Sequence, residues 1–121
     1  MLKSKIHMAT ITESNLKYFG SISIDESLCK DADLLPFEKV EIYNCNNGNR
    51  FSTYVILGKK GEICVNGAAA RQVQKGDIII IASYSEYSNL DLQSYKPKLI
   101  FVDDSNNIRN HKNYIDSTIN E

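Results

Sequence analysis

The residues of this chain whose side chains can do chemistry lie in small groups along the sequence. They are Lys5 and His7, the pair Gly20-Ser21, the set Arg50, Thr53 and Tyr54, and the small-residue turn Asn66-Gly67-Ala68-Ala69-Ala70. They offer cations, hydroxyl groups, a phenol and an amide, which are groups that bind carboxylates and transfer protons. No phosphate loop, serine nucleophile elbow, pair of histidine ligands or cysteine–histidine couple occurs at meaningful spacing. Because each group also has an ordinary structural explanation, spacing alone assigns no function.

Composition narrows the class of protein. A length of 121 residues, with 42% hydrophobic and 24% charged residues, predicts one domain that folds without metal or disulfide staples. The net charge of -1 provides no general attraction to nucleic acid or to an anionic membrane. The longest apolar run, residues 78–82, is far shorter than the ~20 residues of a membrane span, and the N-terminus lacks the apolar stretch of a secretory signal. We therefore expect a cytoplasmic protein without nucleic-acid or membrane partners.

Cysteine and histidine usage agrees with this expectation. Cys29, Cys45 and Cys64 are odd in number and form no Cys-x-x-Cys pair, which favours reduced thiols in a reducing compartment. His7 and His111 stand near opposite ends of the chain, so we expect no zinc site and no structural metal.

The elements that must position these residues are mostly short strands. Alternation of apolar and polar residues predicts strands at 5–11, 21–24, 39–45, 50–57 and 62–65, a fully buried strand at 78–83 and a last strand at 99–102. In the first strand, Ile6 and Met8 are expected on one face, opposite Lys5 and His7. Residues 84–96 fit either a loop or a helical turn, and residues 12–15 are expected to be a polar break.

Three further local signals complete the pattern. Asp25 is suited to cap a short helix over 26–32, which Pro36 prevents from continuing, and residues 46–49 predict a hairpin turn. From Asp103 onward the composition is polar, and a loosely held tail over about 103–121 is expected. Together the elements indicate an all-β fold, a small β-barrel with one or two short helices.

Taken together, separate blocks of the sequence resemble the pyruvoyl-dependent aspartate 1-decarboxylases. The blocks, which occur in compatible order over most of residues 1–102, are 5–7, 18–25, 47–54, 65–70 and 76–83. The chain departs from the family pattern at Phe19, Tyr43 and Arg71, where an acidic residue, Trp and His occur in relatives. The resemblance implies a six-stranded double-psi β-barrel, assembled as a homotetramer with active sites between neighbouring subunits.

The resemblance also implies that the chain cuts itself between Gly20 and Ser21, giving chains 1–20 and 21–121. The Ser21 hydroxyl would attack the Gly20 carbonyl, and β-elimination and hydrolysis would leave a pyruvoyl group and release ammonia. Gly20 lacks a Cβ and can adopt the sharp bend this attack requires. Thr53 and Asn66 would polarise the oxygen that gains charge. The implied cofactor is thus a covalent pyruvoyl group made from Ser21, with no metal and no pyridoxal phosphate.

The implied reaction converts L-aspartate to β-alanine and carbon dioxide for pantothenate and coenzyme A biosynthesis. The pyruvoyl ketone would form a Schiff base with the substrate amine and accept the electrons left by decarboxylation. Arg50 and Lys5 would bind the β-carboxylate, and Tyr54 would donate a proton to the carbanion. The remaining implied residues are Thr53 and the backbone amides of Gly67, Ala68 and Ala69 at the substrate, with Tyr18 and His7 behind them. Some relatives need a helper protein for processing.

Two alternatives stay open at this point. The chain could keep the barrel as a binding or assembly module without activity, or it could be a pyruvoyl decarboxylase of another acidic amino acid. A module without activity is expected to lack some residues of the implied active site. All six main ones are present, namely Lys5, Ser21, Arg50, Thr53, Tyr54 and Asn66.

Overall fold

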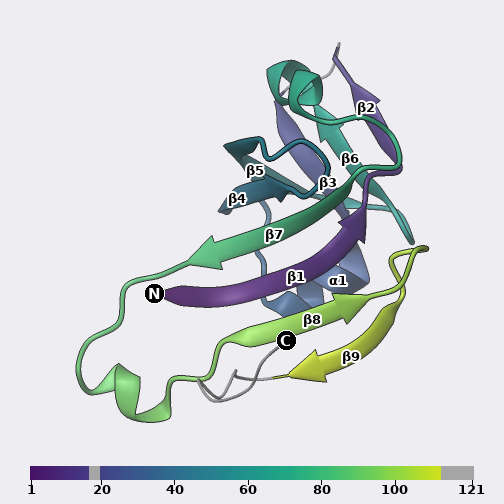
Figure 1. Ribbon diagram of the computed structural model, residues 1–121. Coiled ribbons are helices and arrows are strands. Elements are labelled where there is room, and N and C mark those ends of the chain that lie inside the picture. The colour runs from purple at the N-terminus through teal and green to yellow at the C-terminus, as the bar shows by residue number, and fades with distance from the viewer. Residues whose placement is uncertain (17–19, 113–121) are drawn as a thin grey trace.

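The computed structural model describes residues 1–16 and 20–112, which form one curved sheet with one α-helix and two short 3-10 helices (Figure 1). The elements are β1 (Leu2–Thr10), β2 (Glu13–Asn15), β3 (Ser21–Asp25), α1 (Glu26–Ala32), β4 (Lys39–Asn44), β5 (Arg50–Gly58), β6 (Ile63–Asn66), η1 (Gly67–Gln72), β7 (Ile78–Tyr84), η2 (Asp91–Ser94), β8 (Lys98–Val102) and β9 (Ile108–Lys112). The all-β class with a short helix is therefore confirmed. The described residues contain nine strands, whereas the resemblance implied a barrel of six.

The strand order places the residues expected to act in self-processing on neighbouring strands. The order is β2-β6-β3-β5-β4-β7-β1-β8-β9, so β3 lies between β6 and β5. It pairs antiparallel with β6 and parallel with β5. Every residue of β3 is buried, which is typical of a central strand covered on both faces.

Isoleucine dominates the core, because β-branched side chains pack well on a pleated surface. The isoleucines that are at most 1% exposed are Ile6, Ile11, Ile22, Ile24, Ile42, Ile63, Ile79, Ile81 and Ile100. The prediction of a fully buried strand at 78–83 is wrong in part. Ile78 and Ile80 are only half-buried, since their positions on β7 alternate with those that face the core.

A backbone irregularity changes the expected faces of β1. Ile6 is fully buried as predicted, but Met8 is 42% exposed and Ala9 takes the buried position instead. The register of β1 against β7 shifts between Ile6 and Ala9, and Met8 has a φ of 62°. A bulge of this kind adds a residue and turns the following side chains to the other face. The expectation that Ile6 and Met8 share a face is therefore wrong.

The segment after β8 is part of the sheet, which corrects the expectation of a loosely held tail for residues 103–112. β9 pairs antiparallel with β8. Between them, Asn106 is only 1% exposed and its amide bonds both backbone polar groups of Thr10, at 2.8 Å from the N–H and 2.9 Å from the carbonyl. A third bond joins Asn106 Nδ2 to the carbonyl of Gly61 at 3.0 Å. Residues 113–121 lie outside the described part of the chain.

The shorter elements agree with the sequence-based predictions only in part. The stretch expected to be a polar break contains β2, which pairs in parallel with β6 through Glu13 and Cys64. Residues 84–96, which the sequence left open, include η2 within a loop that extends away from the sheet (Figure 1). The turn at 46–49 is confirmed, with Gly48 at a φ of 77° that favours glycine. Within the described residues, no helix has the length and apolar character needed to cross a membrane.

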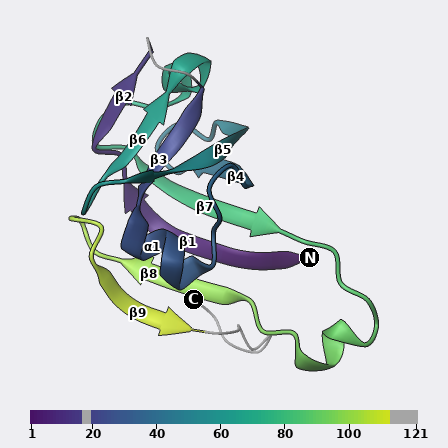
Figure 2. The ribbon, with the colours of Figure 1, turned by 180° about the vertical axis from the view of Figure 1, so that it is seen from behind.

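Helix α1 covers 26–32 as predicted, and Asp25 caps it. It packs against β1, β3, β5 and β8, as the view in Figure 2 shows. The Asp25 carboxylate accepts bonds from Ser27 N at 2.8 Å, Ser27 Oγ at 2.6 Å and Gly61 N at 2.7 Å. Burial raises the pKa of Asp25, but these hydrogen bonds outweigh burial and hold the pKa below its ordinary value of 3.8.

Asp25→Ala is expected to destabilise the fold, because the backbone N–H groups of Ser27 and Gly61 and the Ser27 hydroxyl lose their acceptor. We expect a loss of about 2–3 kcal/mol, which corresponds to a melting temperature lower by roughly 10 °C. The folded-state pKa is depressed, so this stabilisation is present above about pH 4 and is lost as the pH falls through the folded value. Thermal melts between pH 3 and pH 7 measure both effects. A melting temperature unchanged in Asp25→Ala at pH 7 would contradict the cap.

Candidate active site

The clearest polar contact of the site joins Ser21 to Asn66. The two residues are partners in the register of β3 and β6, so their side chains leave the same face of the sheet. Asn66 Nδ2 donates to Ser21 Oγ at 3.0 Å, and both residues are at most 3% exposed. Figure 1 shows β3 and β6 side by side, with η1 at the end of β6. The sequence-predicted pair is therefore brought together in a buried site.

Two residues that the sequence did not single out complete the contacts of the Asn66 amide. Its Nδ2 also donates to Ser23 Oγ at 3.2 Å, and its Oδ1 accepts from Cys64 Sγ at 3.2 Å. Ser23 and Cys64 are also register partners, one step further along the same face. Alternation along each strand was the available signal, because residues i and i+2 of a strand share a face.

Gly20, the residue before Ser21, lies at the surface. It is exposed, and a Cβ built on it would meet no atom of the described residues within 4 Å. Tyr18 and Phe19 lie outside the described residues.

Thr53 and Tyr54 stand on the strand next to Ser21. β5 runs parallel to β3 with Val55 beside Ile22, and one further step of this register places Tyr54 level with Ser21. Thr53 is then level with the residue before Ser21, on the opposite face of β5. Both side chains are half-buried. The arrangement puts a hydroxyl and a phenol on the two sides of the strand beside the Gly20–Ser21 bond.

The small residues after Asn66 form a 3-10 helix where the sequence predicted a turn. η1 begins at Gly67, whose φ of 67° lies in the region that favours glycine. Ala68 is exposed and Ala69 is half-buried. The backbone of Gly67, Ala68 and Ala69 therefore starts directly at the end of the strand that carries Asn66. Small side chains there allow a ligand to approach the main chain closely.

Arg50 stacks on an aromatic ring at the start of β5. Its guanidinium carbon lies 4.2 Å from the centre of the Tyr43 ring, and the Tyr43 hydroxyl is 2.8 Å from that of Tyr84. Burial, followed by the contact with Tyr84, raises the pKa of Tyr43 to about 12. Tyr43 stands where the family resemblance implies Trp, and its ring provides a face for the Arg50 cation.

Lys5 and His7 lie far from Ser21 along the sheet. Strand β1 is separated from β3 by β7, β4 and β5. The registers join Lys5 to Ala82, Ala82 to Glu41 and Glu41 to Ser52, so three strand spacings, roughly 14 Å along the sheet, separate Lys5 from β5, and β3 lies one strand further. Strand pairing within one chain therefore brings Ser21 and Asn66 together but leaves Lys5 at a distance. His7 packs edge-on against Phe101, with ring centres 5.4 Å apart.

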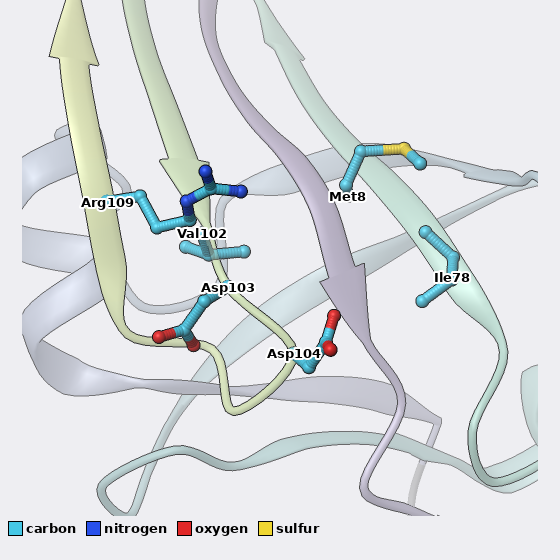
Figure 3. Close-up of a pocket in the computed structure, with 6 residues that line it drawn as sticks. All are labelled: Met8, Ile78, Val102, Asp103, Asp104 and Arg109. Atoms are coloured by element: carbon cyan, nitrogen blue, oxygen red, sulfur yellow. The ribbon is translucent and has the colours of Figure 1, made fainter.

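Two cavities formed by described residues adjoin the sheet. A cavity of about 320 Å³ adjoins the Asn66 contacts and is lined by Glu13, Asn15, Ser23, Ile56, Glu62, Cys64 and Asn66. A second, of about 430 Å³, is shown in Figure 3 and is lined by Met8, Ile78, Val102, Asp103, Asp104 and Arg109, all outside β3, β5 and β6. Among residues 1–16 and 20–112, no group of three or more His, Cys, Asp or Glu side chains is placed to hold a metal ion.

Comparison with known proteins shows what this site is related to. The family described as Aspartate decarboxylase matches residues 1–109 of the chain. The chain belongs to the aspartate decarboxylase family. It is 60% identical over 111 residues to the aspartate 1-decarboxylase of Syntrophus aciditrophicus (strain SB), covering 90% of this chain and 96% of that relative. It is 61% identical over 108 residues to the aspartate 1-decarboxylase of Hydrogenobaculum sp. (strain Y04AAS1), covering 89% and 86%.

A relative with lower identity also matches the chain over most of its length. The aspartate 1-decarboxylase of Clostridium botulinum (strain 657 / Type Ba4) is 56% identical over 116 residues, which cover 94% of this chain and 91% of the relative. Membership of the aspartate decarboxylase family confirms the resemblance that the blocks of sequence indicated. It disfavours a binding module, because the residues that the family resemblance assigned to the site are present.

Proposed function

We propose that this chain is an aspartate 1-decarboxylase that makes its own pyruvoyl group from Ser21 and converts L-aspartate to β-alanine. Aspartate decarboxylation, with β-alanine supplied for pantothenate, follows from membership of the aspartate decarboxylase family. One observation supports the self-processing step. The Ser21 hydroxyl is buried at the first position of β3 and receives a hydrogen bond from Asn66, directly after the exposed Gly20.

Self-processing would proceed on the chain's own atoms. Ser21 Oγ attacks the Gly20 carbonyl carbon, the C–N bond breaks, and the amide becomes an ester. Loss of the Ser21 Cα proton then expels the Gly20 carboxylate and leaves dehydroalanine. Addition of water releases ammonia and leaves a pyruvoyl group at the start of chain 21–121. The Asn66 amide and the Thr53 hydroxyl would donate to the oxygen that gains charge in the first step.

Ser21 fits as the origin of this group, because the strand ladder and the Asn66 amide hold its Cβ and Oγ at a defined position. The pyruvoyl group supplies a ketone that condenses with an amine and takes up the electron pair released when carbon dioxide leaves. Tyr54, level with Ser21 on the neighbouring strand, would give the proton that replaces the carboxylate. The N–H groups of Gly67, Ala68 and Ala69 would bind the substrate beside it.

Recognition of the β-carboxylate is assigned to Arg50 and Lys5. A guanidinium binds a carboxylate through paired hydrogen bonds, and a second cation strengthens the attraction. Stacking on Tyr43 orients Arg50 before substrate arrives. The preference for aspartate over the longer glutamate would then depend on the distance between these cations and Ser21. Comparing the decarboxylation of the two amino acids tests the alternative that the chain acts on another acidic amino acid.

The separation of Lys5 from Ser21 within one chain supports a site shared between subunits. We propose a homotetramer in which Lys5 and Arg50 of one copy face Ser21 of another, with His7 and Tyr18 supporting the site. A helper protein for processing, which the family resemblance implies for some relatives, would be a further partner. All of the cysteines are unbridged, as a reducing, cytoplasmic compartment favours.

Denaturing mass spectrometry of the purified wild-type chain tests the proposal. We expect a fragment ending at Gly20 and a second fragment, 21–121, that is lighter by one ammonia than a chain starting with serine. An intact mass of the full 121 residues that persists after prolonged warming would overturn self-processing.

Arg50→Ala is expected to lower kcat/KM for aspartate by roughly 10- to 100-fold through a higher KM, because a charged hydrogen bond is lost. Its self-cleavage should be unaffected. If the site is shared, co-expression of Arg50→Ala with an uncleavable Ser21→Ala chain should restore part of the activity in mixed oligomers. Lys30→Ala, which removes an exposed cation from α1, is the control and should keep the wild-type KM. Mixed oligomers without any recovered activity would argue for a site within one subunit.

A further inference from the structure

The Asn66 amide could occupy its place in two orientations that differ by a half-turn about χ2. In the orientation observed, Nδ2 donates to Ser21 Oγ and Ser23 Oγ, and Oδ1 faces Cys64 Sγ. After a half-turn, Oδ1 would face Ser21, where it could accept a proton but donate nothing. Only the observed orientation keeps an N–H at Ser21 Oγ, from which it could pass to the Gly20 carbonyl oxygen as that oxygen becomes negative during the attack. The use of Asn66 in self-processing therefore depends on what holds its amide.

The two serines do not select between these orientations. A hydroxyl group both donates and accepts, so a serine is compatible with either Nδ2 or Oδ1 as its neighbour. Cys64 is the third contact of the amide, at 3.2 Å from Oδ1. Its S–H can donate to a carbonyl oxygen, whereas its sulfur is a poor acceptor for an N–H. Of the three contacts, the thiol is the one that prefers the observed orientation.

The surroundings of Cys64 keep the thiol in the form that donates. The side chain is 6% exposed. Burial raises its pKa, and the nearby carboxylates of Glu62 and Glu13 raise it further, so the sulfur carries its proton at neutral pH. The strand ladder fixes the position of the thiol, since Cys64 is two residues before Asn66 on β6 and opposite Ser23 on β3.

We propose that Cys64 is a positioning residue for self-processing: its S–H binds Asn66 Oδ1 and keeps the Asn66 NH₂ group on Ser21 Oγ. This inference rests on the proposed self-cleavage at Gly20–Ser21. Cys64 itself takes no part in the chemistry and touches none of the atoms that react. Its effect is to set the fraction of molecules in which the Asn66 amide is ready to donate.

The test follows cleavage of newly synthesised chains over time by denaturing mass spectrometry. Cys64→Ala and Cys64→Val, which lack the donor, should cleave about threefold to tenfold more slowly than wild type. Cys64→Ser restores a donor at the same position and should recover the rate to within about twofold. Valine fills the space and suits a strand, so a slow valine variant with a wild-type melting temperature separates the lost donor from a lost contact.

The matched control is the other buried cysteine. Cys29 is 2% exposed and its thiol points to the carbonyl of Ile24 at 3.7 Å, so Cys29→Ala should cleave at the wild-type rate. Wild-type rates in both Cys64→Ala and Cys64→Val, or a serine variant as slow as alanine, would overturn the inference. A wild-type chain that never cleaves would instead overturn the proposed function. In that case NMR of ¹⁵N-labelled protein tests the inference. The side-chain NH₂ protons of Asn66 should lie close to Ser23 in the wild type, and this proximity should be lost in Cys64→Ala.

Discussion

Ser21→Ala is expected to remain a single chain of 121 residues with no decarboxylase activity. Alanine has no hydroxyl to attack the Gly20 carbonyl, so neither the ester nor the pyruvoyl group can form. The loss should be complete, because the cofactor is absent from every molecule. Mass spectrometry measures the missing cleavage, and release of carbon dioxide from aspartate measures the missing activity.

The substitution removes one oxygen atom from a buried site, so the fold should survive it. Melting temperature and oligomeric state therefore serve as checks that any loss is chemical. Ser83→Ala is a matched control, since Ser83 is 1% exposed on β7 and bonds Glu38 away from the site. It should cleave like wild type. Decarboxylase activity retained by an uncleaved Ser21→Ala chain would refute the origin of the cofactor.

Asn66→Ala is expected to slow cleavage at Gly20–Ser21 by roughly 10²- to 10³-fold, the usual cost of removing one donor to a developing oxyanion. The substitution also removes the 3.0 Å bond from Asn66 to Ser21 Oγ. Time courses of the uncleaved and cleaved masses measure the rate. Chains that do cleave should carry a normal pyruvoyl group, because Asn66 acts before that group is complete.

Asn106→Ala is the matched control for Asn66→Ala. Asn106 is also a buried asparagine that makes hydrogen bonds to other strands and loops, but it lies beyond β8 and touches Thr10 and Gly61. It should lower the melting temperature and leave the cleavage rate unchanged well below that temperature. If both variants cleave equally slowly, Asn66 acts through stability and its role as a donor is wrong.

Features that depend on neighbours in the chain were predictable from the sequence. Asp25 caps α1 over the predicted residues, and the turn at 46–49 joins β4 to β5 as its glycine indicates. Caps and tight turns are decided within a few residues, so a single sequence carries their signals. The same holds for the blocks of residues that indicated the aspartate decarboxylase family.

Features that depend on strand pairing were not predictable in this way. The contact of Asn66 to Ser23 arises because β3 and β6, far apart in sequence, pair in one register, whereas its contact to Cys64 joins residues i and i+2 of β6. The bulge at Met8 and the buried amide of Asn106 likewise depend on strands brought together by folding. Alternation reports which residues share a face of one strand, but it carries no information about which strand lies beside it.

The sequence by itself indicated the family, most of the strands and the residues able to do the chemistry. The tertiary structure decided which of them meet: Ser21 meets Asn66 across paired strands, whereas Lys5 stands on β1, with β7, β4 and β5 between it and β3. Chemistry requires contacts of about 3 Å, and contacts between distant segments are set by register and sheet order. For this reason the sequence pointed to Ser21 as the serine proposed to react, and only the fold showed which donors lie beside it.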